Sequence, residues 1–132
     1  MAKESQLWKL IKPHFPKDAH VQRIETGGTG RGVPDVNFAH QGKEIWIELK
    51  SIKGNHLTLT EFQIVWMHKR RASGGRCFIL AKKNKELRVF RIRDFQLTEL
   101  LQGNVNWNTE PRLSLVPPYD WDTLFKFILH SY

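Results

Sequence analysis

The chain has 132 residues, enough for one domain with a substantial core and too few for two ordinary domains. It carries 21 Lys and Arg against 13 Asp and Glu, a formal net charge of +8, with 19 of those basic and 10 of those acidic residues in positions 1–103. Such an excess indicates a polyanionic partner, because neutralised phosphates release counterions, and a charge that only keeps the protein soluble is the alternative. No stretch approaches the ~20 consecutive apolar residues of a membrane span, and no signal peptide is evident, so we expect a soluble, cytoplasmic protein.

The first predicted element is a helix from Glu4 to Phe15, with apolar residues recurring every three or four positions. Glu4 lies on the apolar side of this helix. Its carboxylate either stabilises the helix dipole from the first turn or reaches a metal site, and the residues themselves leave both alternatives open.

A short predicted strand, Val21–Thr26, leads into a glycine-rich loop at 27–32. The loop lacks Gly-Lys-Ser/Thr and precedes a strand, so it matches neither common nucleotide-binding motif. We expect it to let a DNA backbone approach closely, with Arg31 contacting a phosphate; a plain hairpin connection is the alternative. Glu25, just before the loop, is a second candidate acid beside Glu4.

A β-hairpin follows, with arms at 32–39 and 43–50. Strand alternation places aliphatic side chains of the second arm on one face and polar or aromatic side chains on the other. The two sets are Ile45, Ile47 and Leu49, and Glu44, Trp46, Glu48 and Lys50. A turn centred on Gly42, of two or four residues, sets Asn37 opposite Trp46 and Asp35 opposite Glu48.

The two opposed acids predict a metal site. Directly opposed residues of antiparallel strands have Cβ atoms roughly 4.5–5.5 Å apart, and like charges there destabilise the pair unless a cation lies between them. Asp35 and Glu48, with the carbonyl of Leu49, offer the oxygen ligands that Mg²⁺ or Mn²⁺ prefers. Lys50 is placed to orient a water and to hold a phosphate oxygen, which predicts metal-assisted phosphodiester hydrolysis. An exposed hairpin whose acids only solubilise it is the alternative.

A turn at 51–56 carries Lys53, a candidate phosphate contact. A helix is predicted over Glu61–Ala72, capped by Thr58 or Thr60. Gln63 lies in its first turn, and we expect three side chains of this helix to face inward. These are Phe62, Val65 and Trp66.

The last turn of that helix is strongly cationic. Lys69, Arg70 and Arg71 suit the negative end of the helix dipole, and they are also candidate DNA contacts. Both interpretations stay open.

Two more strands are predicted at 76–81 and 87–92, and Asp94 is expected to cap a short helix ending at Leu101. Cys77, the single cysteine, is expected to be a core residue, since one cysteine and scattered histidines form neither a disulfide framework nor a zinc motif. The order αβββαββα indicates a single-domain α/β fold with a central mixed sheet flanked by helices. Residues 1–103 are expected to form this core. Residues 104–132 are expected to form a loop-rich extension, whose last helix starts at Asp120 or Asp122 and leaves part of its apolar face for a homodimer contact.

Pro34-Asp35 followed by Glu48-Leu49-Lys50 resembles the signature of the PD-(D/E)xK nuclease superfamily, whose core is restriction-endonuclease-like. The stretches at 32–35, 48–51 and 59–63 are similar to the VRR-NUC branch and its Holliday-junction-resolvase relatives, many of them phage-encoded. This likeness spans roughly 21–80. It implies that Asp35, Glu48 and Leu49 hold the metal, that Gln63 supports the attacking water, and that Glu4 approaches the metal.

We therefore expect a Mg²⁺- or Mn²⁺-dependent DNA endonuclease that leaves 5′-phosphate and 3′-hydroxyl ends, as the resemblance implies. It would act on branched DNA such as a Holliday junction, or nick duplex DNA, with RNA left open as a substrate. A resolvase cuts two strands symmetrically and so favours a homodimer, whereas a nickase or flap nuclease can act as a monomer. The alternatives are a nucleic-acid-binding module that does not cut and a nuclease subunit that needs a partner for targeting. A phage-encoded protein would act in the host cytoplasm.

Overall fold

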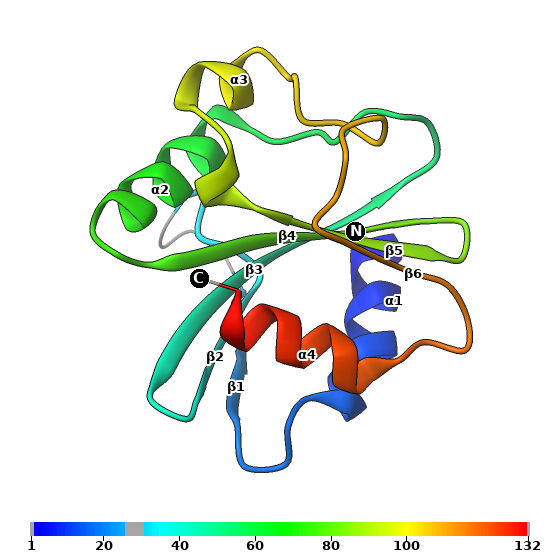
Figure 1. Ribbon diagram of the computed structural model, residues 1–132. Helices are drawn as coiled ribbons and strands as arrows, with labels where there is room; N and C mark the ends of the chain where they lie inside the picture. The colour runs from blue at the N-terminus through cyan, green and yellow to red at the C-terminus, as the bar shows by residue number, and fades with distance from the viewer. Residues whose placement is uncertain (1, 26–30, 132) are drawn as a thin grey trace.

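The computed structural model describes residues 2–25 and 31–131, and side chains from residue 5 onward. The described residues form four α-helices and six strands (Figure 1). In order they are α1 (Ala2–Ile11), β1 (His20–Arg23), β2 (Val36–His40), β3 (Lys43–Ile52), α2 (Glu61–Ala72), β4 (Arg76–Lys83), β5 (Glu86–Arg91), α3 (Leu97–Leu101), β6 (Leu113–Leu115) and α4 (Trp121–His130).

The strands form one six-stranded sheet in the order β1-β2-β3-β4-β5-β6. All neighbours are antiparallel except β3 and β4, which are parallel because α2 crosses over between them. The predicted single-domain α/β fold with a mixed sheet is therefore confirmed. The β2–β3 turn is the two-residue alternative, Gln41-Gly42, and both residues have positive φ (52° and 77°), as the tightest hairpin turns require.

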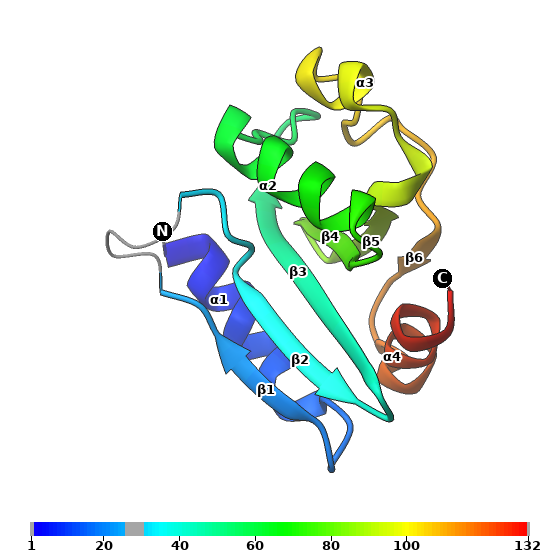
Figure 2. The same ribbon diagram turned by 90° about the vertical axis from the view of Figure 1, so that its left-hand side faces the viewer.

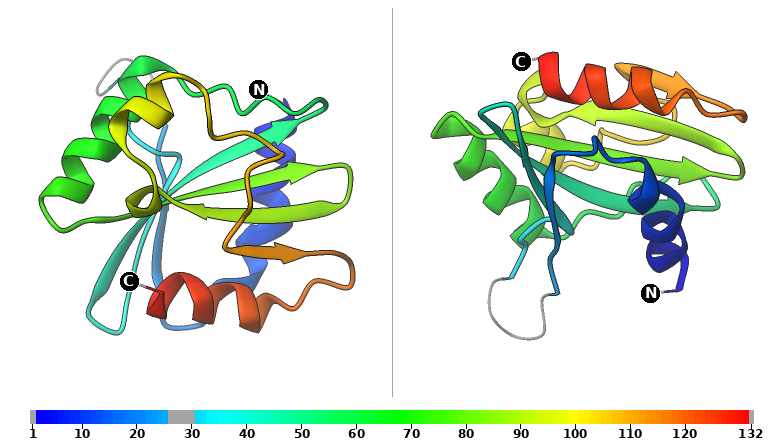
Figure 3. Two further views of the ribbon diagram at one scale, coloured as in Figure 1. Left: turned by 45° about the horizontal axis from the view of Figure 1, so that its top comes forward. Right: turned by 90° about the horizontal axis from the view of Figure 1, so that it is seen from below.

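Each face of the sheet has its own apolar core. On one face, α1 and α4 cover side chains that include Ile45, Ile47 and Leu49 of β3. On the other face, α2 and α3 pack over a second cluster, against which Trp46 also packs. The views in Figures 2 and 3 show these helices on opposite sides of the sheet. The predicted alternation of β3 is confirmed, and it sends the acidic and aromatic side chains to the α2 face.

The N-terminal elements are shorter than predicted. The first helix ends at Ile11, because Pro13 lies in a separate 3-10 turn at Lys12–His14 rather than in a continued α-helix. The first strand ends at Arg23 rather than at residue 26. Most of the glycine-rich loop, at 26–30, lies outside the described residues.

Helix α2 spans Glu61–Ala72 as predicted, and Thr60 rather than Thr58 caps it. The Thr60 hydroxyl accepts the Gln63 amide N–H (3.1 Å), and the Gln63 side chain returns a bond to the Thr60 amide (2.9 Å), a reciprocal capping box. The expectation that Phe62 faces inward is wrong: it is 54% exposed, and Ile64 and Met67 are buried instead. Because Gln63 turns toward the sheet, its neighbour Phe62 turns toward solvent.

The C-terminal third differs most from expectation. Gln96, not Asp94, precedes α3 and forms a capping box with Glu99, while Asp94 ends a 3-10 turn and pairs with Arg91 (2.8 Å). The segment predicted as loop contains β6, which adds an edge strand beside β5. Its three residues are too few for strand alternation to be recognised in sequence.

Asp120 caps α4, and the apolar residues of this helix are buried inside the chain. Leu124, Phe125, Ile128 and Leu129 belong to the core under the sheet, so α4 leaves no broad apolar face for a dimer contact. Cys77 is buried, as expected. In the described part of the chain no helix has the length and apolar character needed to cross a membrane.

Candidate active site

The hairpin brings two carboxylates together where β2 begins. The ladder pairs Val36 with Ile47 and Asn37 with Trp46, the predicted register. Asp35 lies just before the ladder, and its Oδ2 accepts the backbone N–H of Leu49 at 2.8 Å. Asp35 is thereby fixed against the segment that carries Glu48.

Glu48 is the one charged residue buried among the described side chains, at 2% exposure. Its Oε2 accepts hydrogen bonds from the Gln63 side chain (2.9 Å) and the Lys50 ammonium (3.3 Å). Burial, with the neighbouring Asp35 charge adding and Lys50 opposing, raises the pKa of Glu48 to about 8. The metal-free site therefore favours the protonated form of this acid at neutral pH.

Lys50 is held between Glu48 and Gln63. Its Nζ lies 3.3 Å from Glu48 Oε2 and 3.3 Å from the side-chain oxygen of Gln63. Gln63 in turn is fixed by the cap at Thr60, so the first turn of α2 positions the lysine of β3. Asp35, Glu48, Lys50 and Gln63, all predicted from the sequence, meet in one place.

The residues present fit a divalent cation. Glu48 Oε1 is buried without a hydrogen-bond partner among the described residues, an acceptor that a cation would satisfy. A positive charge between Asp35 and Glu48 would also offset the repulsion and burial that raise the Glu48 pKa. No third His, Cys, Asp or Glu of the described part of the chain completes a cluster with these two acids.

The other predicted acids are not placed at the site. The Glu4 side chain lies outside the described residues. Glu25 is exposed, next to Ile24, whose N–H binds the Asp35 carbonyl at 2.7 Å.

Arg23 is a site residue that the sequence analysis missed. Its guanidinium donates to the carbonyl of Asp35 (2.9 Å) and lies 3.4 Å from the Asp35 carboxylate. Arg23 of β1 pairs with Val36 of β2, a residue far from it in the sequence. Only the sheet register could have revealed it.

The predicted DNA contacts lie in different surroundings. The Arg31 guanidinium lies over the exposed ring of Phe62 (5.1 Å to the centroid), in a hollow also lined by Asp35. Lys53 is exposed in the bend after β3.

The three cations at the end of α2 diverge. Lys69 and Arg70 line a pocket between α2 and β3, whereas Arg71 donates to the Phe95 carbonyl (3.2 Å) on the side of α3. Arg71 is thus partly used inside the fold.

The family model of the archaeal Holliday junction resolvase (Hjc) matches residues 3–115. The chain belongs to this family. The family is part of the PD-(D/E)xK nuclease superfamily, so that resemblance is confirmed. Members are divalent-metal-dependent nucleases, and the chain is a structure-selective, metal-dependent DNA endonuclease.

Among solved structures, Hjc from Archaeoglobus fulgidus, a Holliday junction resolvase of an archaeal hyperthermophile, has a similar fold. The TM-score is 0.54 at 16% identity, over 89% of this chain and 88% of that chain. The protein SSO0001 aligns with a TM-score of 0.42 and 14% identity, over 76% of this chain and 54% of that chain. No curated protein matches the sequence.

Proposed function

We propose that this endonuclease cuts four-way DNA junctions with Mg²⁺ or Mn²⁺ held by Asp35 and Glu48. The observation that carries this assignment is the buried, unpartnered Oε1 of Glu48 beside Asp35. A carboxylate is rarely buried in this way unless a cation or a proton neutralises it. When bound, the metal would polarise the scissile phosphate and lower the pKa of a bound water.

The carbonyl of Leu49 is a third candidate oxygen ligand. The Leu49 N–H points to Asp35, and in an extended strand the N–H and C=O of one residue point to the same side. That side lies beyond the first residue of β2, so no β2 backbone group pairs there. This geometry supports the assignment of the Leu49 carbonyl as a ligand on the side of Asp35.

Lys50 and Gln63 are assigned to the attacking water and the phosphate. Lys50, steadied by Glu48 and Gln63, would donate to the water or to a non-bridging phosphate oxygen and stabilise the charge that develops there. The water oxygen bonds to phosphorus and the 3′ oxygen leaves, giving 5′-phosphate and 3′-hydroxyl ends. Glu4, whose side chain lies outside the described residues, remains a candidate for completing the ligand set.

Symmetric cutting of a junction requires two active sites, so we propose a two-fold dimer as the active species. Arg31 and Lys53 are proposed to hold the DNA backbone beside the metal. The closer likeness to the VRR-NUC branch, a phage origin, a cytoplasmic location and a core boundary at residue 103 remain predictions from the sequence.

The test is cleavage of a labelled four-way junction, a flap, a matched duplex and a single strand, with Mg²⁺, Mn²⁺ or EDTA. Asp35→Asn and Lys50→Ala are compared with Asp122→Asn and Lys126→Ala, an exposed ion pair of α4. We expect symmetric, metal-dependent junction cutting that only the first two variants lose. Tight binding without cutting by the wild type on every substrate would contradict the assignment and indicate a binding module or a subunit that needs a partner.

A further inference from the structure

A second pocket lies directly beside the proposed active site, between the same two elements. On α2, Gln63, Trp66 and Arg70 share one face at helical spacing. On β3, Glu48 and Trp46 share the facing side at strand spacing. Gln63 contacts Glu48, and Arg70 contacts Trp46, so the active site and the pocket are successive sections of one interface.

An aromatic cluster forms part of the pocket wall. The Trp46 and Trp66 rings lie 4.9 Å apart between centroids at 63°, and the Arg70 guanidinium lies 4.7 Å from Trp66 and 5.2 Å from Trp46. The indole N–H of Trp46 is buried without a hydrogen-bond partner among the described residues. The two rings and the guanidinium hold one another in place. The Trp46 N–H is left as a hydrogen-bond donor without a partner among the described residues.

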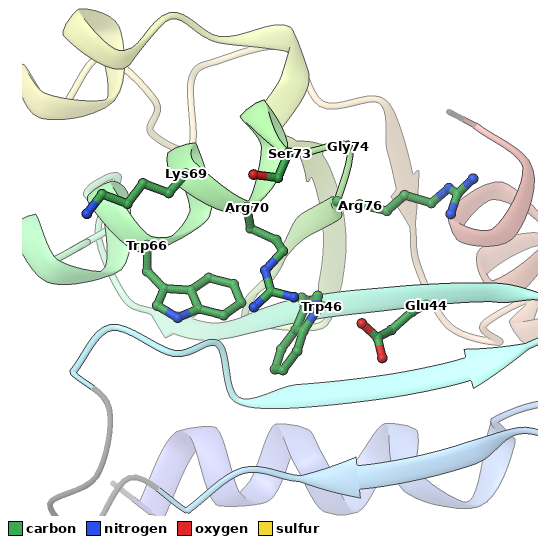
Figure 4. A pocket seen from close by; sticks show the side chains of 9 residues that line it. Glu44, Trp46, Trp66, Lys69, Arg70, Ser73, Gly74 and Arg76 are labelled. Carbon is green, nitrogen blue, oxygen red and sulfur yellow. The ribbon is translucent and has the colours of Figure 1, made fainter.

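The rest of the pocket is mainly cationic. Lys69 and Arg76 line it beside Arg70, with Glu44 as its one acid (Figure 4). Lys69 and Arg76 form no ion pair with any residue that the structure describes. The cavity measures about 550 Å³, within the range of small-ligand sites.

We propose that this pocket binds one unpaired nucleotide of the DNA, close to the scissile phosphate. The base would stack against the Trp66–Arg70 surface, and the phosphates on its two sides would be held one by Lys69 and the other by Arg76, whose side chains extend in opposite directions from the pocket (Figure 4). Trp46 lies two residues from Glu48 along an extended strand, or roughly 6.6 Å, so the bound nucleotide is a near neighbour of the cut. The inference rests on the proposed nuclease function and adds a source of its substrate preference.

The pocket favours unpaired DNA because base faces inside a duplex are already stacked on their neighbours. Aromatic platforms gain their affinity from exposed base faces, whatever the base. A flap supplies such a base, and the interruption of stacking at a branch point exposes base faces, whereas an intact duplex offers neither. Glu44 would repel an acidic ligand at only one edge of the pocket. The three cations of the pocket, Lys69, Arg70 and Arg76, outweigh its charge.

The experiment measures binding in EDTA, so that no cutting occurs. The probes are a single strand and a flap with 2-aminopurine at the unpaired position, and a fully paired duplex of the same sequence. Trp66→Leu, Trp66→Phe and Arg76→Gln are compared with Lys126→Gln, which removes an exposed charge on α4. Trp66→Phe keeps an aromatic face, and Arg76→Gln tests the pocket even if the half-buried Trp66 variants fold poorly.

We expect Trp66→Leu to weaken binding of the unpaired probes between about 5-fold and 150-fold, with duplex affinity unchanged within about twofold. Trp66→Phe should retain most of the affinity. For the unpaired probes, Arg76→Gln should reduce the slope of log affinity against log salt concentration by about one. The 2-aminopurine signal should change on binding to wild type and not to Trp66→Leu.

Equal losses on duplex and unpaired probes, or no loss with Arg76→Gln, would overturn the inference. A shift in the monomer–dimer equilibrium with both variants would also overturn it, since the pocket would then be a subunit contact. Selective binding of unpaired DNA by a wild type that never cuts would contradict the nuclease assignment alone. Normal cutting with unchanged selectivity in the variants would contradict the pocket alone.

Discussion

The two faces of the sheet use the same strand for different purposes. On the α1–α4 face, β3 contributes Ile45, Ile47 and Leu49, which are at most 1% exposed. On the α2 face the alternate residues are polar or aromatic, and they include the buried Glu48. One face stabilises the fold through apolar burial, and the other holds a charge that burial makes costly. The candidate active site therefore lies on the face where burial of a charge costs stability, and the apolar packing of the opposite face supports it.

Removing the charged groups of the α2 face should abolish activity without unfolding the chain. We expect Lys50→Ala to lower junction cutting by about 10²–10⁴-fold, the range for a positioned proton donor or acceptor. Although Glu48 would lose its cationic partner, metal-free stability should change little at pH 6, because this acid is largely protonated there. Single-turnover cleavage and thermal unfolding of the same samples measure the two effects. A variant that loses activity only because it unfolds would contradict the separation of the faces.

Truncating the opposite face should do the reverse. Phe38→Ala removes a fully buried ring that contacts Phe15 and Phe125, and we expect it to lower the free energy of unfolding by about 3–5 kcal/mol. The remaining folded protein should still bind metal and cut. Urea titration gives the stability, and activity is normalised to the folded fraction. A loss of activity per folded molecule similar to that of Lys50→Ala would contradict the division of stability and activity between the two faces.

The buried acid should make the metal-free protein pH-sensitive. The folded-state pKa of Glu48, about 8, is above the ordinary value of 4.5, so ionisation opposes folding. Its contribution to stability is favourable at low pH and is lost progressively as pH rises from about 4.5 to about 8. Glu48→Gln should flatten this profile in chemical denaturation measured in EDTA.

Metal binding should show the opposite trend. A cation displaces the Glu48 proton, so metal affinity should rise with pH up to about 8 and then level off. Calorimetry in two buffers of different ionisation enthalpy measures the released proton. Absence of proton release at pH 7 would show that Glu48 is not the ligand.

The smallest effect is expected at the cap of α2. Thr60→Ala removes the hydroxyl that accepts the Gln63 N–H, and it should cost about 1 kcal/mol of stability. Because Gln63 also contacts Lys50 and Glu48, a modest drop in cutting should accompany it. Thr60→Ser, which keeps the hydroxyl, is the matched control. Equal effects of both variants would show that the cap does not position the glutamine.

Much of the site could be predicted because its signals are local. The hairpin turn fixes the register that brings Asp35 toward Glu48, and the spacing after Lys50 places Gln63 in the first turn of α2. Three features escaped prediction because each depends on contacts between residues far apart in the chain. These are Arg23 beside the candidate site, Trp66 in the neighbouring pocket and β6 in the sheet. The exposure of Phe62 was missed because helical periodicity alone does not say which of two neighbouring faces meets the sheet.

Local sequence patterns were enough to predict most of the elements, the alternation of β3 and the chemical types of the proposed catalytic groups. These depend on periods of two and 3.6 residues and on turn residues, all of which act over short distances. The packing of the chain places α2 over the acidic face of β3, and no local pattern predicts this. That packing buries Glu48, raises its pKa to about 8 and joins Trp46, Trp66 and Arg70 in one pocket. Burial and charge proximity are properties of the packed chain, because desolvation requires neighbours that the local sequence does not supply.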